Sequence, residues 1–334
     1  MSTSTNPTTA AETAPQAVED ARPVRGFIER YALVGLLVLL FGVCSIALPE
    51  FRSISILQVM VSSQAVVLLL ALTATIVLRT GYFDLSIPAI MLTATAIIVV
   101  GNHHGQPLAL LILIALVAGA AVGGLNALLI VWLGVDSFVT TLGVFTALTG
   151  LTYAITDSKV VLGVPDALIN FSRDREFGLP AITYYGWGLA IVLWYVYQRT
   201  PLGRYMLFIG GSPDAAKLSG IRVGRICTGA FVFSGLIAAA VGVLLAGNLG
   251  AIDPSIGNQY LLAPYAAVFL GATAITVGRF NAIGTVVALY LLVVGITGLQ
   301  IAGADTWVNN VFNGCALIIA VSLAKLVARS RARG

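Results

Sequence analysis

The chain has 334 residues, of which 58% are hydrophobic and only 10% are Asp, Glu, Lys or Arg, and its mean hydropathy is +0.97. Soluble domains carry about a quarter of their residues as charges, so this composition excludes a soluble globular protein. The 35 Gly and 12 Pro residues are more than a plain bundle of leucine-rich helices needs, and they favour close helix contacts and interrupted helices within a bilayer.

A long polar tail precedes the first apolar run. Residues 1–30 are rich in Ser, Thr, Ala and Pro and cannot bury a core, so they predict a disordered cytoplasmic tail. A secretory signal would place its apolar run directly behind a basic start, whereas here the first run begins at Tyr31. We therefore expect that run to be retained as the first membrane helix.

Apolar runs of about 17 to 25 residues, long enough to cross a bilayer, recur along the rest of the chain. They predict an all-α polytopic membrane protein of about ten transmembrane helices, with a membrane domain over residues 31–327 and a basic cytoplasmic tail over residues 328–334. A broken or re-entrant helix is expected at the short third run, which follows the irregular Gly81–Pro88. The expected spans are Tyr31–Leu48, Leu57–Leu78, Ile87–Gly101, Leu108–Leu133, Phe138–Thr156, Ala181–Tyr197, Ile226–Gly247, Leu261–Val277, Ala282–Ile301 and Trp307–Leu326.

Positive charge is sorted across these spans. With the tail placed in the cytoplasm, fourteen of the 18 Lys and Arg residues fall inside and four outside. This bias predicts an even number of spans with both termini in the cytoplasm.

A short motif occurs twice, before the fifth span and before the tenth. Gly134–Val139 and Gly303–Val308 each combine a small turn, an acid, a hydroxyl and an aromatic residue, and the Ser or Thr after the Asp can cap the helix that follows. The copies are five spans apart, so they face opposite sides of the membrane, as in the inverted repeats of transporters. Chance similarity in apolar sequence is the alternative.

Small residues also recur at helical spacing, for example Gly119 and Gly123, and they favour close helix packing.

The residues needed for several kinds of chemistry are missing from the sequence. The three lysines follow Ser158, Ala216 and Ala324, so there is no glycine-rich phosphate-binding loop, and this chain is not expected to bind or hydrolyse ATP. The adjacent His103 and His104 have no acid nearby to complete a metal site, and no membrane histidine supports a serine protease. We therefore expect no enzyme activity, no metal and no cofactor on this chain.

The longest internal cytoplasmic segment, residues 198–225, carries the signals of a short helix outside the membrane. Ser212 suits the N-cap, Pro213 the first helical position, Asp214 the positive helix end and Gly220 the stop. A simple connector would show the same signals, so the segment alone does not assign a role.

Four segments in combination resemble the ribose-type permeases of bacterial ATP-binding-cassette sugar importers, over about Leu57–Leu326. They are the cytoplasmic segment, Gly81–Ser86, Asp136–Gly143 and the stretch from Gly271 to Thr285. The resemblance implies a multi-pass protein of the bacterial plasma (inner) membrane that works with a second permease copy or homologue. It also implies two cytoplasmic ATPases that hold ATP and Mg, a periplasmic or lipid-anchored solute-binding protein, and a monosaccharide as solute.

Within the resemblance, the cytoplasmic segment would carry the helix that couples the permease to its ATPase. The chain departs from the family pattern at Tyr82, Phe83 and Pro88, where smaller or different residues are usual. These bulkier residues could change the shape of the path that the solute takes through the membrane, so the resemblance says least about the solute. By their position in the resemblance, the residues that would contact the ATPase are Gly210, Gly211, Ser212, Pro213, Asp214, Ala215, Ala216, Lys217, Leu218, Ser219, Gly220 and Ile221.

Polar side chains within the spans are costly to leave facing lipid, which makes them candidates to line a path for a neutral solute. Hydrogen bonding between helices is the alternative for each of them. A channel or an ATP-independent secondary transporter is the alternative function, with Asp84 as the one acid for ion coupling, and nothing indicates a nucleic-acid partner. The candidates are Asp84, Asn126, Thr140, Thr141, Thr297, Gln300, Asn309, Asn310 and Asn313.

Overall fold

The computed structural model describes residues 21–333, and the side chains over residues 30–322. Most of these residues are helical, and the chain is an all-α polytopic membrane protein. Within the described part, six helical stretches are long and apolar enough to cross a bilayer. They are Arg30–Ala47, Ile54–Leu78, Leu108–Trp132, Ser137–Ile155, Val223–Leu249 and Ala282–Ile301.

Each of the ten expected spans contains a helix, and short elements lie between them. Residues 1–20 of the expected tail lie outside the described residues; the first helix begins at Ala21, and the last one runs through residues 328–333 of the expected C-terminal tail. In chain order the elements are α1 (Ala21–Ala47), η1 (Pro49–Arg52), α2 (Ile54–Ser63), α3 (Ala65–Leu78), α4 (Ile87–His103), α5 (Leu108–Ala127), η2 (Leu128–Trp132), α6 (Ser137–Ile155), β1 (Val161–Leu162), α7 (Asp166–Arg173), β2 (Arg175–Glu176), β3 (Leu179–Pro180), α8 (Ala181–Arg199), α9 (Pro201–Gly211), α10 (Pro213–Leu218), α11 (Val223–Leu249), β4 (Ala251–Ile252), η3 (Pro254–Asn258), α12 (Gln259–Gly271), α13 (Ala282–Ile301) and α14 (Trp307–Arg333).

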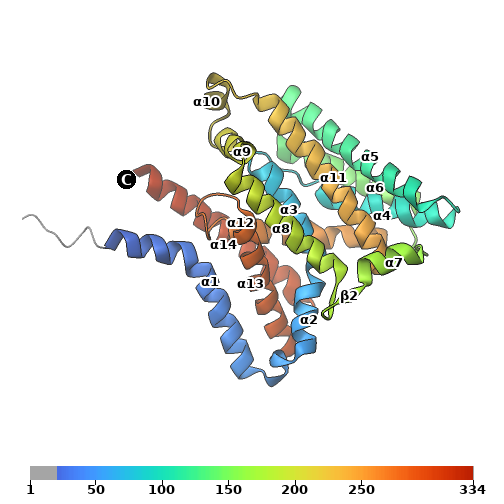
Figure 1. Ribbon diagram of the computed structural model, residues 1–334, viewed down its shortest axis with the longest axis horizontal. Helices are drawn as coiled ribbons and strands as arrows, with labels where there is room; N and C mark the ends of the chain where they lie inside the picture. The colour runs from blue at the N-terminus through green and yellow to red at the C-terminus, as the bar shows by residue number, and fades with distance from the viewer. Residues whose placement is uncertain (1–20, 334) are drawn as a thin grey trace, which may run out of the picture.

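The helix α3 lies at the centre of the bundle, and every one of its residues is buried. Figure 1 shows α4, α5, α6 and α11 on one side of it and α1, α12, α13 and α14 on the other, in agreement with their packing contacts. The outer helices expose apolar side chains, such as Val38 on α1 and Val117 on α5, because lipid rather than water surrounds them. The protein core is therefore formed mainly by α3, α4, α11, α12 and α13.

Glycines bring α5 and α11 into backbone contact. A Cβ atom on Gly119 would lie 2.5 Å from the carbonyl oxygen of Gly235, and one on Gly123 would lie 2.3 Å from that of Phe231. These distances leave no room for a side chain, so the spacing of small residues serves packing, as the sequence predicted.

The connections form two groups at opposite ends of the bundle (Figure 1). One end carries α9 and α10, and the other carries α7 and the four short strands, because α8 and α11 each run the length of the bundle between them. Strand β1 pairs antiparallel with β4, and β2 pairs antiparallel with β3. Helix α7 was not predicted, because its eight residues are too short to show a clear period; it buries Leu168 and Ser172 against α11.

The predicted span Leu261–Val277 is wrong at its second end. Helix α12 stops at Gly271, and its 13 residues extend only about 20 Å, less than the thickness of the hydrocarbon core. A Cβ atom on Gly271 would lie 2.5 Å from the backbone nitrogen of Thr285, so the start of α13 packs directly on the end of α12. The chain between them turns through Ile275 and Gly278, both with positive φ.

Replacing Gly123 by Ala should destabilise the protein, because the new methyl group would meet the Phe231 carbonyl. Overpacking costs about 1–3 kcal/mol, whereas Ala in an open helical position gains about 0.5–1 kcal/mol over Gly. Gly124 is the matched control, since a Cβ there meets only a Val232 methyl at 4.0 Å. Thermal unfolding in detergent should show a lower midpoint for Gly123→Ala and an equal or higher one for Gly124→Ala; equal midpoints for both would contradict the packing account.

Candidate functional site

Residues 79–86 interrupt the helical path between α3 and α4, at the place where the sequence predicted a broken helix. We call this segment the first break. Gly81 has a φ of +90°, which favours glycine, and Pro88 lies in the first turn of α4, where its missing N–H is no loss. The break is buried from Asp84 onwards, so its backbone needs partners other than water.

A chain of polar side chains joins the first break to α5. The backbone N–H and the hydroxyl of Ser86 both donate to Asp84 Oδ1, at 3.1 and 2.5 Å. Asn126 Nδ2 donates to Ser86 Oγ at 2.8 Å and lies 3.4 Å from the same Asp84 oxygen. Asp84 is 1% exposed and Asn126 is fully buried, so this network is sealed from solvent in this conformation.

Two further helices hold the backbone of the first break. The N–H groups of Phe83 and Leu85 donate to Ser137 Oγ and Thr141 Oγ1 on α6, at 3.2 and 3.0 Å. The Tyr265 hydroxyl on α12 donates to the Asp84 carbonyl oxygen. Side chains of α6 and α12 therefore replace helical hydrogen bonds that the backbone of the break gives up.

Three buried oxygen atoms near this network have no hydrogen-bond partner among the described residues: Asp84 Oδ2, Asn126 Oδ1 and Thr140 Oγ1. A buried polar atom without a hydrogen-bond partner costs about 1–3 kcal/mol. The first break thus combines irregular backbone, a buried acid and unsatisfied acceptors in one place.

A second interruption, residues 272–281 between α12 and α13, is organised by one side chain. Asn281 Nδ2 donates to the carbonyl oxygens of Gly271, Ala274 and Arg279, at 3.0–3.2 Å. Its Oδ1 accepts the N–H of Gly284 at 2.6 Å and so caps α13. We call this segment the second break.

Arg79 connects the two breaks to each other and to the α8–α9 corner. Its guanidinium donates to the carbonyl oxygens of Gly203 at 3.3 Å, Tyr197 at 3.4 Å and Phe280 at 2.7 Å. It also lies 4.3 Å from the centre of the Tyr197 ring, within the range of a cation–π interaction. Phe83 stacks on Phe269, which packs edge-on against Phe280, and this gives a second link between the breaks.

Helix α10 has the caps that the sequence predicted. Ser212 Oγ accepts the N–H of Ala215 at 3.4 Å, and Gly220 takes a φ of +78° beyond the last turn. The helix shows two faces, because Ala216 is fully buried while Leu218 is 91% exposed. The Leu218 side chain is therefore directed away from the bundle.

Helix α9 was not predicted as a helix. Thr200 caps it through its hydroxyl, and Pro201 opens it, so the Thr-Pro pair was the signal available in the sequence. These residues lie in the expected cytoplasmic segment 198–225, in which the sequence predicts only the shorter helix that Ser212 caps.

The α9–α10 segment touches the first break directly. A Cβ atom on Gly210 would lie 2.5 Å from the Arg79 carbonyl oxygen and 3.3 Å from the Gly81 nitrogen, so the two backbones are in contact. Tyr82 packs against the cluster formed by Ile209, Ala216, Val223 and Cys227, and its ring lies 6.0 Å from that of Phe231 on α11. Tyr82, a departure from the pattern of the ribose-type permeases, therefore fills the space between the break and α10.

Comparison with known proteins identifies the family. A model of the permease component of branched-chain amino acid transport systems matches residues 55–321. The chain belongs to this permease family. The ribose import permease of Bacillus subtilis is 32% identical over 87% of this permease and 90% of its own length, and that of Escherichia coli K12 is 29% identical over 88% and 92%. The autoinducer 2 import system permease protein LsrC of Photorhabdus laumondii is 29% identical over 86% of both chains. No solved structure matches the permease.

The remaining candidates for a path lie away from the first break, at the α13–α14 hairpin. Gln300 Nε2 donates to Asn309 Oδ1 at 3.4 Å across the hairpin. Thr297 and Asn313 are half-buried, and Asn310 is exposed. The structure therefore groups Asp84, Asn126, Thr140 and Thr141 and places the other five candidates separately.

Sequence reasoning missed the residues that organise the permease around its breaks. Arg79 ends a long apolar run, and a charge in that place could have been recognised as a buried anchor. Asn281 stands directly before the ninth expected span, where its N-cap preference was a usable signal. Tyr265 gave no signal, because nothing in a sequence places its hydroxyl on a backbone carbonyl in another helix.

Replacing Arg79 by Gln should strongly destabilise the permease. The variant would leave carbonyl oxygens of three elements without their donor, at a cost on the order of 3 kcal/mol. Arg204→Gln is the control, because Arg204 lies on the neighbouring α9 and is exposed. The thermal midpoint in detergent should fall by several degrees for Arg79→Gln alone, and an unchanged midpoint would contradict the role given to Arg79.

Proposed function

We propose that the chain is the permease subunit of an ATP-binding-cassette importer and forms the path for a monosaccharide or a similar small polar solute. The observation that carries the proposal is the family match over residues 55–321, together with relatives named as ribose and autoinducer 2 import permeases. The matched region contains both breaks and the α9–α10 segment. ATP and Mg belong to a separate ATPase in this proposal.

Ten membrane crossings with both termini in the cytoplasm agree best with the charge distribution. Besides the six long helices, the crossings would use α8, the shorter apolar helices α4 and α14, and the half-length α12. The α9–α10 end is then cytoplasmic and the α7 end faces outwards. The expected location is the bacterial plasma membrane.

An inverted repeat within these crossings is supported by local geometry. Gly134 and Gly303 both have positive φ, +75° and +98°, at the same place in the repeated motif. Asp136 in the first copy caps α6 through its carboxylate, which accepts the Val139 N–H at 3.0 Å.

In this proposal α10 docks on the ATPase through its exposed face, and Ala216 anchors its other face to the bundle. A second copy or homologue of the permease and a solute-binding protein outside the membrane complete the transporter. Gly210 contacts the first break at Arg79 and Gly81, and Tyr82 within the break packs against the cluster that contains Ala216 of α10. A shift of α10 therefore reaches the break two residues before Asp84. The network of Asp84, Asn126 and Thr141 then acts as the hinge of a gate, and Thr140 and the α13–α14 residues remain candidates for the path itself.

ATP dependence is the most general test of the proposal. Proteoliposomes that contain the permease and its ATPase, supplied with the solute-binding protein, should take up D-ribose or another monosaccharide only when ATP and Mg reach the ATPase. The permease alone should give no uptake. Robust uptake by the permease alone, driven by a sodium or proton gradient, would instead support a secondary transporter.

Replacing Gly210 by Val should uncouple the ATPase from transport, because the side chain would force α9 away from the first break. Gly211→Val is the matched control, since a Cβ there meets nothing within 4 Å. We expect uptake per ATP hydrolysed to fall about tenfold for Gly210→Val and to stay near the original value for Gly211→Val. Equal ratios in both variants would refute the route through Gly210.

A further inference from the structure

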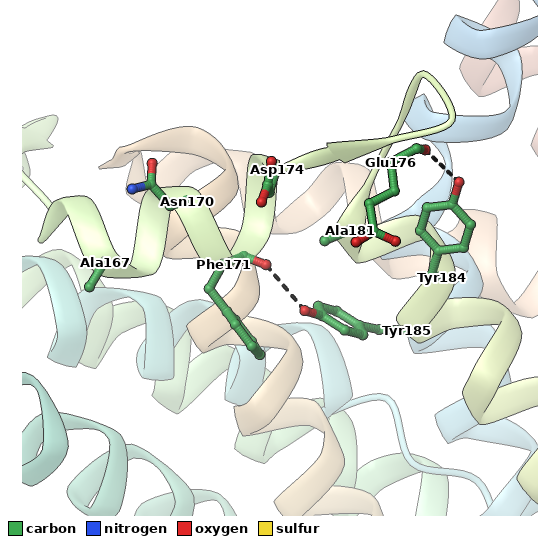
Figure 2. A pocket seen from close by; sticks show the side chains of 8 residues that line it. All are labelled: Ala167, Asn170, Phe171, Asp174, Glu176, Ala181, Tyr184 and Tyr185. Carbon is green, nitrogen blue, oxygen red and sulfur yellow. Dashed lines mark hydrogen bonds between the residues drawn. The ribbon is translucent and has the colours of Figure 1, made fainter.

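A pocket of about 460 Å³ lies between α7, β2 and the start of α8, at the end of the bundle opposite to α9 and α10 (Figures 1 and 2). Its residues come from α7, from the start of α8 and from the segment between them, whereas α5, α6 and α12 surround Asp84. The pocket is therefore separate from the break described above. Its lining consists of Ala167, Asn170, Phe171, Asp174, Glu176, Ala181, Tyr184 and Tyr185.

Charges are sorted around this pocket. Residues 173–176 alternate as Arg, Asp, Arg and Glu, and Asp174 and β2 are extended, so successive side chains point to opposite sides. Asp174 and Glu176 line the pocket, while Arg173 turns away and its Nε donates to the Asn248 carbonyl oxygen on α11 at 2.6 Å. Among the described residues that line the pocket, none is Lys, Arg or His.

Hydrogen bonds fix the aromatic rings of the pocket. The Tyr184 hydroxyl donates to the Glu176 carbonyl oxygen at 2.6 Å, and the Tyr185 hydroxyl donates to that of Phe171 at 3.2 Å. The rings of Phe171 and Tyr185 stack with their centres 5.3 Å apart. Figure 2 shows the Glu176 side chain reaching from its strand towards the two tyrosines. Because the hydroxyls are already bonded, the rings offer fixed faces rather than free polar groups.

Two carboxylates beside fixed aromatic rings favour a cation. A guanidinium or ammonium group pairs with carboxylates and lies well on aromatic faces. The pocket also receives the last turn of α7, and the carbonyl end of a helix favours positive charge. A neutral sugar would bring no positive charge to the two carboxylates that line the pocket.

We propose that this pocket receives an arginine or lysine side chain of the solute-binding protein when that protein docks on the outer face. The inference rests on the proposed function, which places the α7 end outside the membrane. A protein partner fits the exposure of the pocket, since Phe171 is 57% exposed and Asp174 and Glu176 are open to solvent. The pair of carboxylates supplies the charge complementarity that selects and orients the partner.

The test compares docking with transport in the whole transporter in nanodiscs and proteoliposomes. The double variant Asp174→Asn with Glu176→Gln should raise the concentration of solute-binding protein for half-maximal uptake about tenfold and leave the maximal rate unchanged. Asp166→Asn is the matched control, because Asp166 is an exposed acid at the start of α7 that does not line the pocket. Unchanged half-maximal concentration in the double variant would overturn the inference.

A small probe tests the chemistry of the pocket directly. N-acetyl-arginine amide should bind the transporter in saturation-transfer NMR, and the double variant should lose this signal. The uncharged citrulline analogue should not bind. Equal binding of both probes, displacement by D-ribose, or displacement by phosphatidylethanolamine would overturn the inference.

If the original transporter shows no ATP-driven uptake, the proposed function fails, whereas normal uptake without an effect of the double variant refutes only the pocket assignment.

Discussion

Eight residues between α3 and α4 leave the helical conformation inside an apolar bundle, where every free peptide group must find a partner. Side chains from α6 and α12 supply partners to its peptide groups, and Asn126 on α5 bonds its side chains, so the first break fixes how these helices approach one another. The same requirement explains why Asn281 donates to three carbonyl oxygens at the second break. Irregular backbone at both places is stable only because specific polar side chains converge on it.

Arg79 and three phenylalanine rings connect the first break to the second. The guanidinium binds carbonyl oxygens at the α8–α9 corner and at Phe280, and Phe83, Phe269 and Phe280 form a parallel apolar link. The α9–α10 segment packs against the first break: Gly210 contacts the backbone of the break, and Tyr82 of the break packs against the cluster that contains Ala216. A partner that moves α10 therefore acts on residues that hold the helices in register.

Much of this architecture could be predicted from the sequence, where local signals are strong. Gly81–Pro88 indicated the interruption, Ser212 and Gly220 indicated the ends of α10, and the spacing of small residues indicated close helix packing, which the structure shows between α5 and α11. The end of α12 at Gly271 could not be predicted, because it depends on the approach of Gly284 and Thr285 from the next helix. The hydroxyl of Tyr265 and the contacts of Arg79 are likewise set by tertiary packing, which no local pattern reports.

Hydrogen exchange of the backbone amides in residues 82–86 tests the central claim most directly. It should be measured by mass spectrometry on the permease bound to its ATPase, with and without ATP and Mg, using an ATPase variant that binds but does not hydrolyse ATP. If α10 transmits its movement to the first break, exchange in these amides should change on the order of tenfold when ATP binds, equivalent to about 1.4 kcal/mol. A change in the protection of α10 with no change in residues 82–86 would contradict the account.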